Sequence, residues 1–403
     1  MPSVRLHHKT NKLFGSRLLL LRITLALACL AGFLLSTELW LASRVYPLTP
    51  LFDWMPAVPS PVDQLWFGSL CFLLAVIVVV RRSRKYLLAF VVLAGLLSLF
   101  DQSRWQPWFY QYLFMFMALA VYPWGEQNLE KRELALNICR FIVASTYLWS
   151  GLQKLNASFV EDLFPWLVEP LVALLPGASE QLVHPLGITV PFIEASIGIG
   201  LLTRYRNAAI ILALSMHAFI LFSIGWFGHD WNMVVWPWNF AMMFFVIILF
   251  WRPEGFSARN VLIPRTSLLH GLVLLLFGVM PLFSFFSLWD SYLSMSLYSS
   301  NTKNAVLYFN KAAEDSLPEA IREFAVKSEV NGANTRISIT KWSWEDLNVP
   351  AYPESRVLQN VAKHVCEEAG DPSGIRLVVN GKPVPVDGSR EADIYDCSTL
   401  GAR

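Results

Sequence analysis

The sequence predicts an all-α polytopic membrane bundle of about nine transmembrane helices, followed by a small α+β extracytoplasmic domain. The chain of 403 residues is 55% hydrophobic and 15% charged, whereas a soluble domain carries about 25% charged residues. Residues 303–403 depart from this composition because they are polar and mixed. We therefore divide the chain into a transmembrane domain, 1–302, and a C-terminal domain, 303–403.

Apolar windows give the expected number of helices. A helix needs roughly 17 to 25 apolar residues to cross the hydrocarbon core. The windows are 18–41, 62–80, 86–101, 107–123, 134–154, 186–203, 207–226, 232–251 and 267–289. The third and fourth are short and separated only by DQSRWQP, so they form either two spans or one re-entrant hairpin. The first lacks a small-x-small cleavage site, which indicates an uncleaved helix rather than a secretory signal.

Loop charges predict the orientation. The basic segments are the amino-terminal tail, RRSRK at 81–85, EKR at 130–132, RYR at 204–206, and Arg252, Arg259 and Arg265. Nine crossings place them all on one side, which the positive-inside rule assigns to the cytoplasm. We therefore expect a multi-pass protein with a cytoplasmic N-terminus and a periplasmic or lumenal C-terminal domain.

The C-terminal domain shows both helix and strand patterns. Helices are expected at 316–328 and 354–370, and an alternating run at 335–344 predicts a strand. Asn380 and Gly381 suit a type I′ turn of a hairpin within 375–386. Cys366 and Cys397 share this compartment, which permits a disulfide without fixing the Cα separation that one requires. The pairing therefore stays open from the sequence alone.

Several function classes lose their usual support. The chain has no CxxC, no His/Cys cluster at metal spacing, no GxGxxG, no P-loop and no GxSxG, so no metal or nucleotide is indicated. The net charge is only +2, and the basic residues lie in loops rather than on one binding face. Nucleic acid is not an expected partner, whereas the lipid bilayer is.

Three polar residues fall near the middle of successive apolar windows: Glu194, His217 and Asn239. Ionisable groups at that depth are costly, so they face the bundle interior or a cavity. Ser196 and Gly200 form a small-xxx-small step that favours close packing of the helix bearing Glu194. The three polar residues either form interhelical hydrogen bonds only or belong to a functional site.

Lys154 ends the window 134–154, within YLWSGLQKLN, against the charge bias of the outer side. On a helix it shares one face with Tyr147 and Gly151, and that glycine admits a neighbouring helix or a ligand. One interpretation is a side chain that extends to the lipid headgroups. The other is a base in an apolar pocket, where a desolvated amine loses its proton more readily.

An ordered set of segments resembles a known family. YLWSGLQKLN, FVEDLF, LVHPLGITVPFIEASIGIGLL and MHAFILFSIGWF are similar to the core of the vitamin K-dependent gamma-carboxylase and the broader HTTM-domain membrane proteins. The similarity covers 134–251, and more weakly LRITLALACLAGFLL, DQSRWQPWFYQYL and WDSYLSMSLYS. In that enzyme the lysine of the matching motif deprotonates a reduced quinone so that O2 adds, and CO2 is then taken up by a glutamate. The resemblance implies that Lys154 is the corresponding base.

The same resemblance implies further site members and marks departures. Asp101 and Arg104 keep a D-x-x-R spacing, at which they either pair with each other or shape the site. His217 matches a family histidine, but the asparagine that follows it in the carboxylase is Ile220 here, and a second lysine is Gln153. The large lumenal part that holds protein substrates is replaced by 303–403. Carboxylation of the same protein substrates is therefore not implied.

The loop WFGHDWNMVVWPWN at 226–239 is the last candidate. His229 next to Asp230 suits a proton shuttle, while the tryptophans favour an aromatic belt at the membrane interface. The segment around Trp166 reads as an amphipathic stretch lying on the outer leaflet.

The leading hypothesis is a membrane enzyme with lysine-base chemistry on a reduced quinone or another lipophilic small molecule, with O2 and CO2 as co-substrates. Its expected catalytic residues are Lys154, His217 and Glu194; its expected substrate-binding residues are Asp101, Arg104, Tyr147, Gly151, His229 and Asn239. A coupled carboxylation would add a protein or peptide partner. The alternative is a non-catalytic transport or assembly protein of the same fold. The enzyme predicts a closed apolar pocket around Lys154, and the transporter predicts polar groups that continue across the bilayer.

Overall fold

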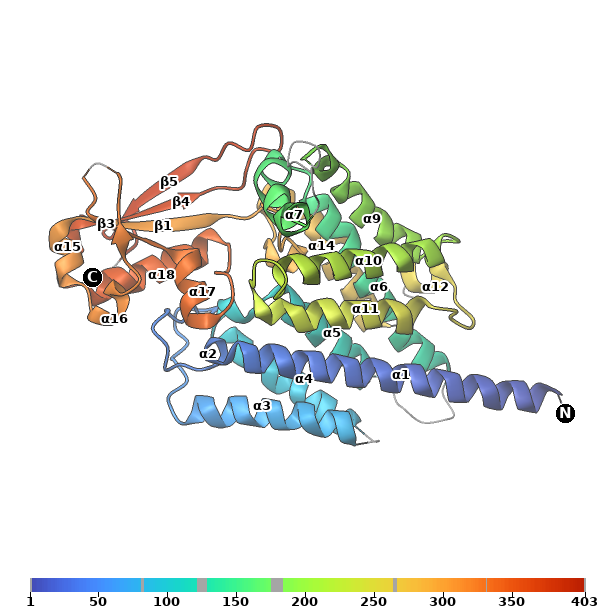
Figure 1. Ribbon diagram of the computed structural model, residues 1–403. Helices are drawn as coiled ribbons and strands as arrows, with labels where there is room; N and C mark the ends of the chain where they lie inside the picture. The colour runs from blue at the N-terminus through green and yellow to red at the C-terminus, as the bar shows by residue number, and fades with distance from the viewer. Residues whose placement is uncertain are drawn as a thin grey trace.

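A computed structural model describes residues 2–80, 83–121, 129–174, 184–263, 267–330 and 332–401. A bundle of helices occupies one part of the molecule, and a β-sheet with its own helices lies at one end of that bundle (Figure 1). We call this the sheet end, and the opposite end, near the chain start, the amino end.

The longer helices run between these two ends (Figure 1). They are α1 (Pro2–Leu35), α3 (Val62–Val79), α4 (Arg84–Leu99), α5 (Pro107–Val121), α6 (Leu129–Gln153), α9 (Val190–Leu201), α10 (Arg206–Ile224), α11 (Trp236–Phe250) and a segmented last helix of α13 (Leu268–Val273), η5 (Leu274–Val279) and α14 (Met280–Phe283). Shorter helices connect them: α2 (Thr37–Trp40), η1 (Gln102–Arg104), η2 (Phe159–Leu163), α7 (Phe164–Val172), η3 (His184–Ile188), η4 (Met233–Val235), α12 (Ala258–Leu262), η6 (Ser284–Phe286) and η7 (Tyr292–Ser294).

Five of the described helices are long and apolar enough to cross a membrane, as expected for a membrane protein. They are Arg17–Leu35, Val62–Val79, Arg206–Ile224, Met233–Phe250 and Leu268–Phe286. The expected count of about nine spans is not confirmed. With 16 and 15 residues, α4 and α5 are about 24 and 22 Å long, less than the roughly 30 Å hydrocarbon core. The long helix α6 begins with the charged run LEKRE.

Basic side chains cap helix ends at the amino end. Arg17 donates to the carbonyls of Ile248 and Trp251, where α11 stops. Arg22 donates to the carbonyl of Val80 after α3, and Arg84 to that of Ala120 near the end of α5. These guanidinium groups satisfy carbonyls that a helix leaves unpaired. The basic segments 83–85, 130–132 and 204–206 thus gather at the end opposite the sheet; Arg81, Arg82 and Arg265 lie outside the described residues.

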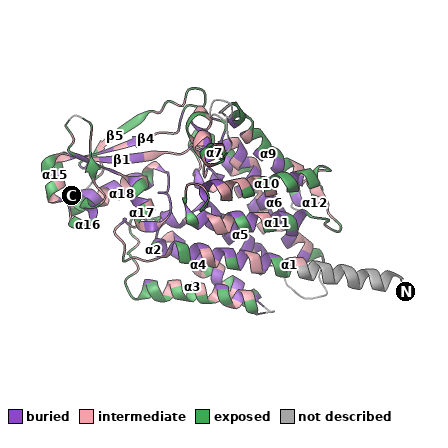
Figure 2. Cartoon of the chain, viewed as in Figure 1, coloured by how far each residue is buried: buried purple, intermediate pink, exposed green. Residues whose placement is uncertain are grey.

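Helix α5 lies in the middle of the bundle (Figure 2). Nearly every side chain along it is buried. Gln111 is a polar member of this helix; its amide lies 3.2 Å from the sulfur of Met242 and accepts from the indole of Trp238, both on α11. The described part of the window 107–123, residues 107–121, therefore forms an interior helix rather than a lipid-facing one.

The sheet has five strands in the order β2-β3-β1-β4-β5, and all neighbours are antiparallel. The strands are β1 (Asn304–Phe309), β2 (Val326–Lys327), β3 (Thr335–Ser338), β4 (Ile375–Asn380) and β5 (Ala392–Asp396). Alternate residues of β1 and β4 are buried, which is the pattern of a sheet covered on one face. The accompanying helices are α15 (Lys311–Ser316), α16 (Glu319–Arg322), α17 (Ile339–Leu347) and α18 (Ser355–Glu368), with the turn η8 (Pro372–Gly374).

Only part of the predicted secondary structure of this region is confirmed. Helix 354–370 is present as α18. Of the helix expected at 316–328, only α16 (Glu319–Arg322) is present, because the helix begins after Pro318 and the end of the segment becomes β2. The strand expected at 335–344 stops at Ser338, whose side chain accepts from the amide of Lys341 and starts α17. Strands β4 and β5 do form a hairpin, but Asn380 and Gly381 are not its turn, because the segment 381–391 loops out before β5.

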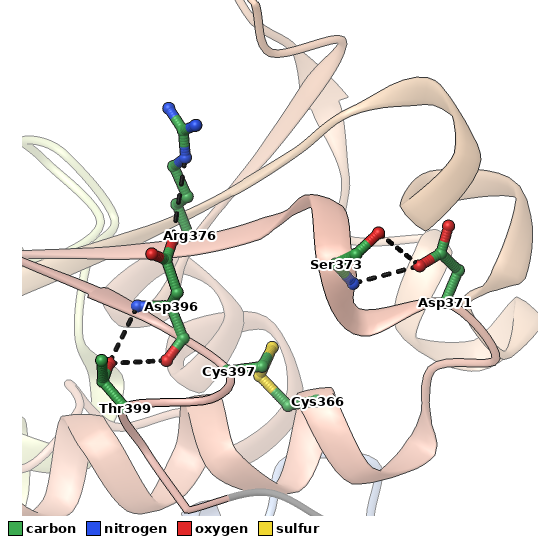
Figure 3. The surroundings of a disulfide bond; sticks show 7 residues. All are labelled: Cys366, Asp371, Ser373, Arg376, Asp396, Cys397 and Thr399. Atoms are coloured by element: carbon green, nitrogen blue, oxygen red, sulfur yellow. Dashed lines mark hydrogen bonds and ion pairs between the residues drawn. A yellow bond between two sulfur atoms is a disulfide. The ribbon is translucent and has the colours of Figure 1, made fainter.

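Cys366 of α18 and Cys397, next to β5, form a disulfide with a Cα–Cα distance of 5.7 Å (Figure 3). This settles the pairing that the sequence left open. The bond joins the edge strand β5 to the helix that covers the sheet.

Polar contacts hold the sheet region against the bundle. Arg356 of α18 forms an ion pair with Asp290 and donates to Gln102. Asp346 of α17 accepts from the amide of Tyr46. These contacts come from both α17 and α18, so two separate helices of the sheet region are attached to the bundle.

Candidate functional site

Lys154 follows α6 directly, at the sheet end, and is 7% exposed. Its Nζ donates to the carbonyl and the hydroxyl of Ser150 at 3.1 and 2.8 Å. The third partner is Oε2 of Glu194, at 2.9 Å. These three acceptors match the three protons of an ammonium group. The side chain therefore turns into the bundle rather than out to the headgroups.

Two glycines, Gly151 and Gly198, let α9, which carries the Glu194 carboxylate, approach α6 closely. A Cβ on Gly151 would lie 2.4 Å from the amide nitrogen of Ala195, and one on Gly198 would lie 2.4 Å from the carbonyl of Ala144. Such distances leave no room for a side chain, so α6 and α9 touch backbone to backbone. Gly151 thus admits a helix, not a ligand. Gly198 makes this contact rather than the expected Ser196 and Gly200; Gly200 faces Ala209 of α10.

A second polar group lies on the same cavity and joins three helices. The hydroxyl of Tyr147 on α6 lies 2.7 Å from Nε2 of His217 on α10. The other ring nitrogen, Nδ1, lies 2.8 Å from Oδ1 of Asn239 on α11. Asn239 uses its NH2 to donate to the carbonyl of Val235, so its oxygen accepts from His217.

The direction of these hydrogen bonds fixes the protonation of a neutral His217. Since Nδ1 donates to Asn239, Nε2 carries the lone pair and accepts the Tyr147 proton. The result is a hydrogen-bonded chain from Tyr147 to the carbonyl of Val235, directly before α11.

A cavity of about 200 Å³ contacts both polar groups. Lys154, Glu194, Tyr147, His217 and Asn239 all line it. The rest of the wall is almost entirely apolar and comes from α7, α9, α10 and α11, with Phe164, Ile193, Phe219 and Met242 as examples. The apolar lining of this cavity is the one that the enzyme hypothesis predicts around Lys154; the closure that this hypothesis also predicts stays a prediction.

Asp101 and Arg104 lie outside the lining of this cavity. Asp101 is fully buried, pairs with Arg44 at 2.5 Å and caps η1 by accepting from the amide of Ser103. Arg104 lies 3.9 Å from Asp101 and donates to the carbonyls of Leu39, Trp40 and Leu97. Of the two readings of the D-x-x-R spacing, the contacts correspond to structural pairing. Nothing in the sequence indicates that Arg44 pairs with Asp101, because the two residues are 57 positions apart.

His229 also lies outside the cavity lining. Its ring stacks on Trp166 of α7 with centroids 4.1 Å apart, and Nε2 donates to the carbonyl of that residue at 2.7 Å. The nearest paired carboxylate is Glu169, at 3.9 Å, rather than the neighbouring Asp230. His229 thus joins the aromatic loop to α7.

Sequence reasoning missed several cavity residues, of which Ser150 and Tyr298 make polar contacts. Ser150 lies one helical turn before Lys154, a spacing that would have identified it. Tyr298, which accepts from Asn232, lies in an irregular segment after the last helix, where no periodicity marks it. Among the described residues, no three His, Cys, Asp or Glu side chains gather as a metal site.

Comparison with protein-family models, curated proteins and solved structures gives no match to this chain.

Proposed function

We propose that the protein is an integral membrane enzyme that removes a proton from a lipophilic hydroxyl substrate, with Lys154 as the base. A reduced quinone is the first candidate substrate, on the resemblance to the vitamin K-dependent gamma-carboxylase. The observation that carries the proposal is the convergence of two polar groups, Lys154–Glu194 and Tyr147–His217–Asn239, on one apolar cavity.

The ion pair supplies a route to a neutral amine. A proton passes from the Lys154 ammonium to the Glu194 carboxylate 2.9 Å away, leaving an amine and a carboxylic acid. Both neutral groups are less costly than charges in an apolar site. The amine then accepts the proton of a substrate O–H, and the resulting oxyanion lies beside a new ammonium group. Tyr147, whose own proton is donated to His217, keeps an oxygen lone pair that can accept from the second hydroxyl of a hydroquinone.

The charges of the site favour an uncharged substrate. Lys154 and Glu194 neutralise each other, and His217 is neutral when its two nitrogens bond as described. A cationic or anionic ligand would therefore bring an unbalanced charge into an apolar cavity, at a cost of several kcal/mol. A hydroquinone or another neutral alcohol carries no such cost.

The transport alternative has less support. On α6 the next ionic group towards the amino end is Arg140, paired with Glu133. Between Arg140 and Tyr147 the buried residues include Phe141, Ile142 and Val143. The charged groups of this helix thus form two separate clusters rather than a continuous path.

The proposed orientation follows loop charge. We place the basic amino end in the cytoplasm and the sheet end, with Lys154, on the periplasmic or lumenal side. The sheet region is then extracytoplasmic, where a disulfide is stable.

The test is turnover of reduced menaquinone or phylloquinone by the purified protein in detergent. Conversion of a hydroquinone to its epoxide consumes one O2 and releases one water, so oxygen uptake and epoxide are measured together. We expect turnover by the wild type and by Lys341→Met, an exposed lysine, and loss of at least about 10²-fold in Lys154→Met. Turnover that survives in Lys154→Met, or none in a folded wild type, would overturn the proposal.

A further inference from the structure

The loop between β4 and β5, residues 381–391, turns back from the sheet towards the bundle (Figure 1). The carbonyl of Pro385 accepts from the amide of Ala157 at 2.9 Å. A Cβ on Gly388 would lie 2.9 Å from the hydroxyl oxygen of Ser158. The tip of the loop therefore lies against the connection between Lys154 and η2.

Both ends of the loop are also fixed. Lys382 donates to the carbonyl and hydroxyl of Ser284, at the end of the last apolar helix, at 2.6 and 2.8 Å. Arg390 donates to the carbonyls of Ser300 and Thr302. The loop is thus held in one place by contacts with the bundle rather than with the sheet.

This fixed loop presents apolar side chains outwards. Val386 is 88% exposed and Val384 is 42% exposed. Each is flanked by proline in the sequence KPVPV, so the backbone that carries them is stiff. An exposed valine side chain contributes no hydrophobic free energy, whereas its full burial is favourable by about 1.5–3 kcal/mol.

The surrounding surface is apolar as well. The helix η2 packs against α7 and η3. Leu186 and Ile188 of η3 are 55% and 57% exposed, and Leu174, two residues after the end of α7, is 65% exposed.

The exposed charges nearby include Glu161 and Asp387, which are acidic. The basic residues of the loop, Lys382 and Arg390, are half-buried and donate to backbone carbonyls. The loop therefore extends an exposed apolar surface of the bundle, and its exposed charge is acidic.

We propose that the 381–391 loop inserts Val386 into the boundary between headgroups and acyl chains of the leaflet at the sheet end. The occupant of this surface is the lipid bilayer, because Lys382 joins the loop to Ser284 in the segment Leu268–Phe286, which is long and apolar enough to cross a bilayer. Since the adjacent exposed charges are acidic, zwitterionic lipid suffices and anionic lipid is not required. The bilayer contact would hold the segment after Lys154 in position.

The experiment places an environment-sensitive fluorophore, NBD, on Val386→Cys in the full chain. Cys29, Cys71 and Cys139 are replaced by alanine, and the disulfide is kept. The protein is reconstituted as one copy per phosphatidylcholine nanodisc. The matched control is Ile394→Cys, on β5 of the same hairpin and 66% exposed.

We expect NBD at 386 to be quenched at least threefold more by doxyl-labelled phosphatidylcholine than NBD at 394, and less by aqueous iodide. Equal iodide access at both sites, with no doxyl quenching, would overturn the proposal. Protection from both quenchers would also overturn it, because it would mean that protein covers Val386. The readout needs no turnover, so it is independent of the proposed enzymatic function.

Discussion

The ammonium of Lys154 has only oxygen acceptors around it, and a single one of them carries charge. Removal of the lysine therefore leaves the Glu194 carboxylate without its counter-ion in an apolar cavity. We expect Lys154→Met to lower the free energy of unfolding by about 3–5 kcal/mol. The double variant Lys154→Met/Glu194→Gln should lose clearly less, since no lone charge remains.

Unfolding in mixed detergent micelles measures both variants. Lys341→Met removes an exposed ion pair with Glu345 and should cost at most about 1 kcal/mol. Equal losses in the single and double variants would contradict the importance of charge balance.

The orientation of His217 gives a second prediction. With Asn239 accepting from Nδ1, ¹⁵N NMR of labelled protein should show Nδ1 protonated and Nε2 unprotonated. Asn239→Leu removes the acceptor, so the other tautomer should appear and turnover should fall by about 10²-fold. Tyr147→Phe keeps the acceptor and should keep the tautomer. A wild-type ring protonated at Nε2 would refute the assigned direction of the chain.

The sequence could predict the site residues that are polar side chains within apolar windows. Glu194, His217 and Asn239 were singled out because ionisable or amide groups there need partners, and all three line the cavity. Their actual pairings were not predictable, because Lys154 meets Glu194 only through the approach of α6 and α9. Asp101, Arg104 and His229 show the opposite case. Asp101 accepts from Arg44 and from a backbone amide, and Arg104 and His229 donate to backbone carbonyls.

At the scale of the element, the close contact between α6 and α9 requires a residue without a side chain at position 198. Gly198→Ala puts a methyl group against the carbonyl of Ala144, so α9 must shift. We expect a loss of about 1–3 kcal/mol and a weaker Lys154–Glu194 contact, visible as lower turnover.

The matched control is Gly95→Ala in α4, where no atom lies within 4 Å of the new Cβ. Alanine is the better helix former by about 0.5–1 kcal/mol, so this variant should be as stable as the wild type or more so. Similar losses at both positions would mean that the close approach is unimportant.

Lys382, near the start of the 381–391 loop, predicts how the free energy of unfolding depends on pH. Burial lowers the pKa of Lys382 to about 8, although Glu354 acts in the opposite direction. Between that pKa and the ordinary value of 10.5, the unfolded chain binds a proton that the folded chain does not. This group's contribution to the free energy of unfolding should therefore rise with pH across that window and stay level below it.

Unfolding curves from pH 7.5 to pH 10.5 test this in wild type, Lys382→Met and Lys341→Met. Only Lys382→Met should lose part of the upward slope. If the slope of the unfolding free energy against pH is unchanged in Lys382→Met, the slope arises from other groups.

Element existence was more predictable than element boundaries. Long apolar windows became helices because the 3.6-residue pattern and the absence of polar interruptions leave few alternatives. The run at 335–344 alternates like a strand, yet Ser338 caps a helix, and such a local hydrogen bond outweighs a short alternation. The number of membrane crossings stays a prediction, because short helices such as α5 gain stability from neighbours rather than from lipid.

At the scale of the molecule, the disulfide fixes the edge of the sheet. The two cysteines are 31 residues apart, and closing a loop of that length stabilises by about 3–4 kcal/mol in the chain-entropy model. We expect Cys366→Ala/Cys397→Ala to lose about that amount for the sheet region, with little change at the bundle. Thermal unfolding with and without reductant measures it.

The same thiols report orientation. In intact cells, a membrane-impermeant maleimide should label Cys366 and Cys397 only after reduction by an impermeant phosphine. Labelling of permeabilised cells alone would place the sheet region in the cytoplasm. Cys29 and Cys139 are buried and serve as internal controls for denaturation.

The interior position of α5 has a consequence for biogenesis. Gln111 finds its partners on α11, 131 residues further along the chain in the case of Met242. Its amide nitrogen also lies 3.7 Å from the sulfur of Met115 within α5, but its oxygen accepts from Trp238, so the partners of this amide are complete only after α11 has been synthesised. An insertase that shelters short, partly polar helices from lipid would meet that need, so the order of helix release is part of how this protein is made.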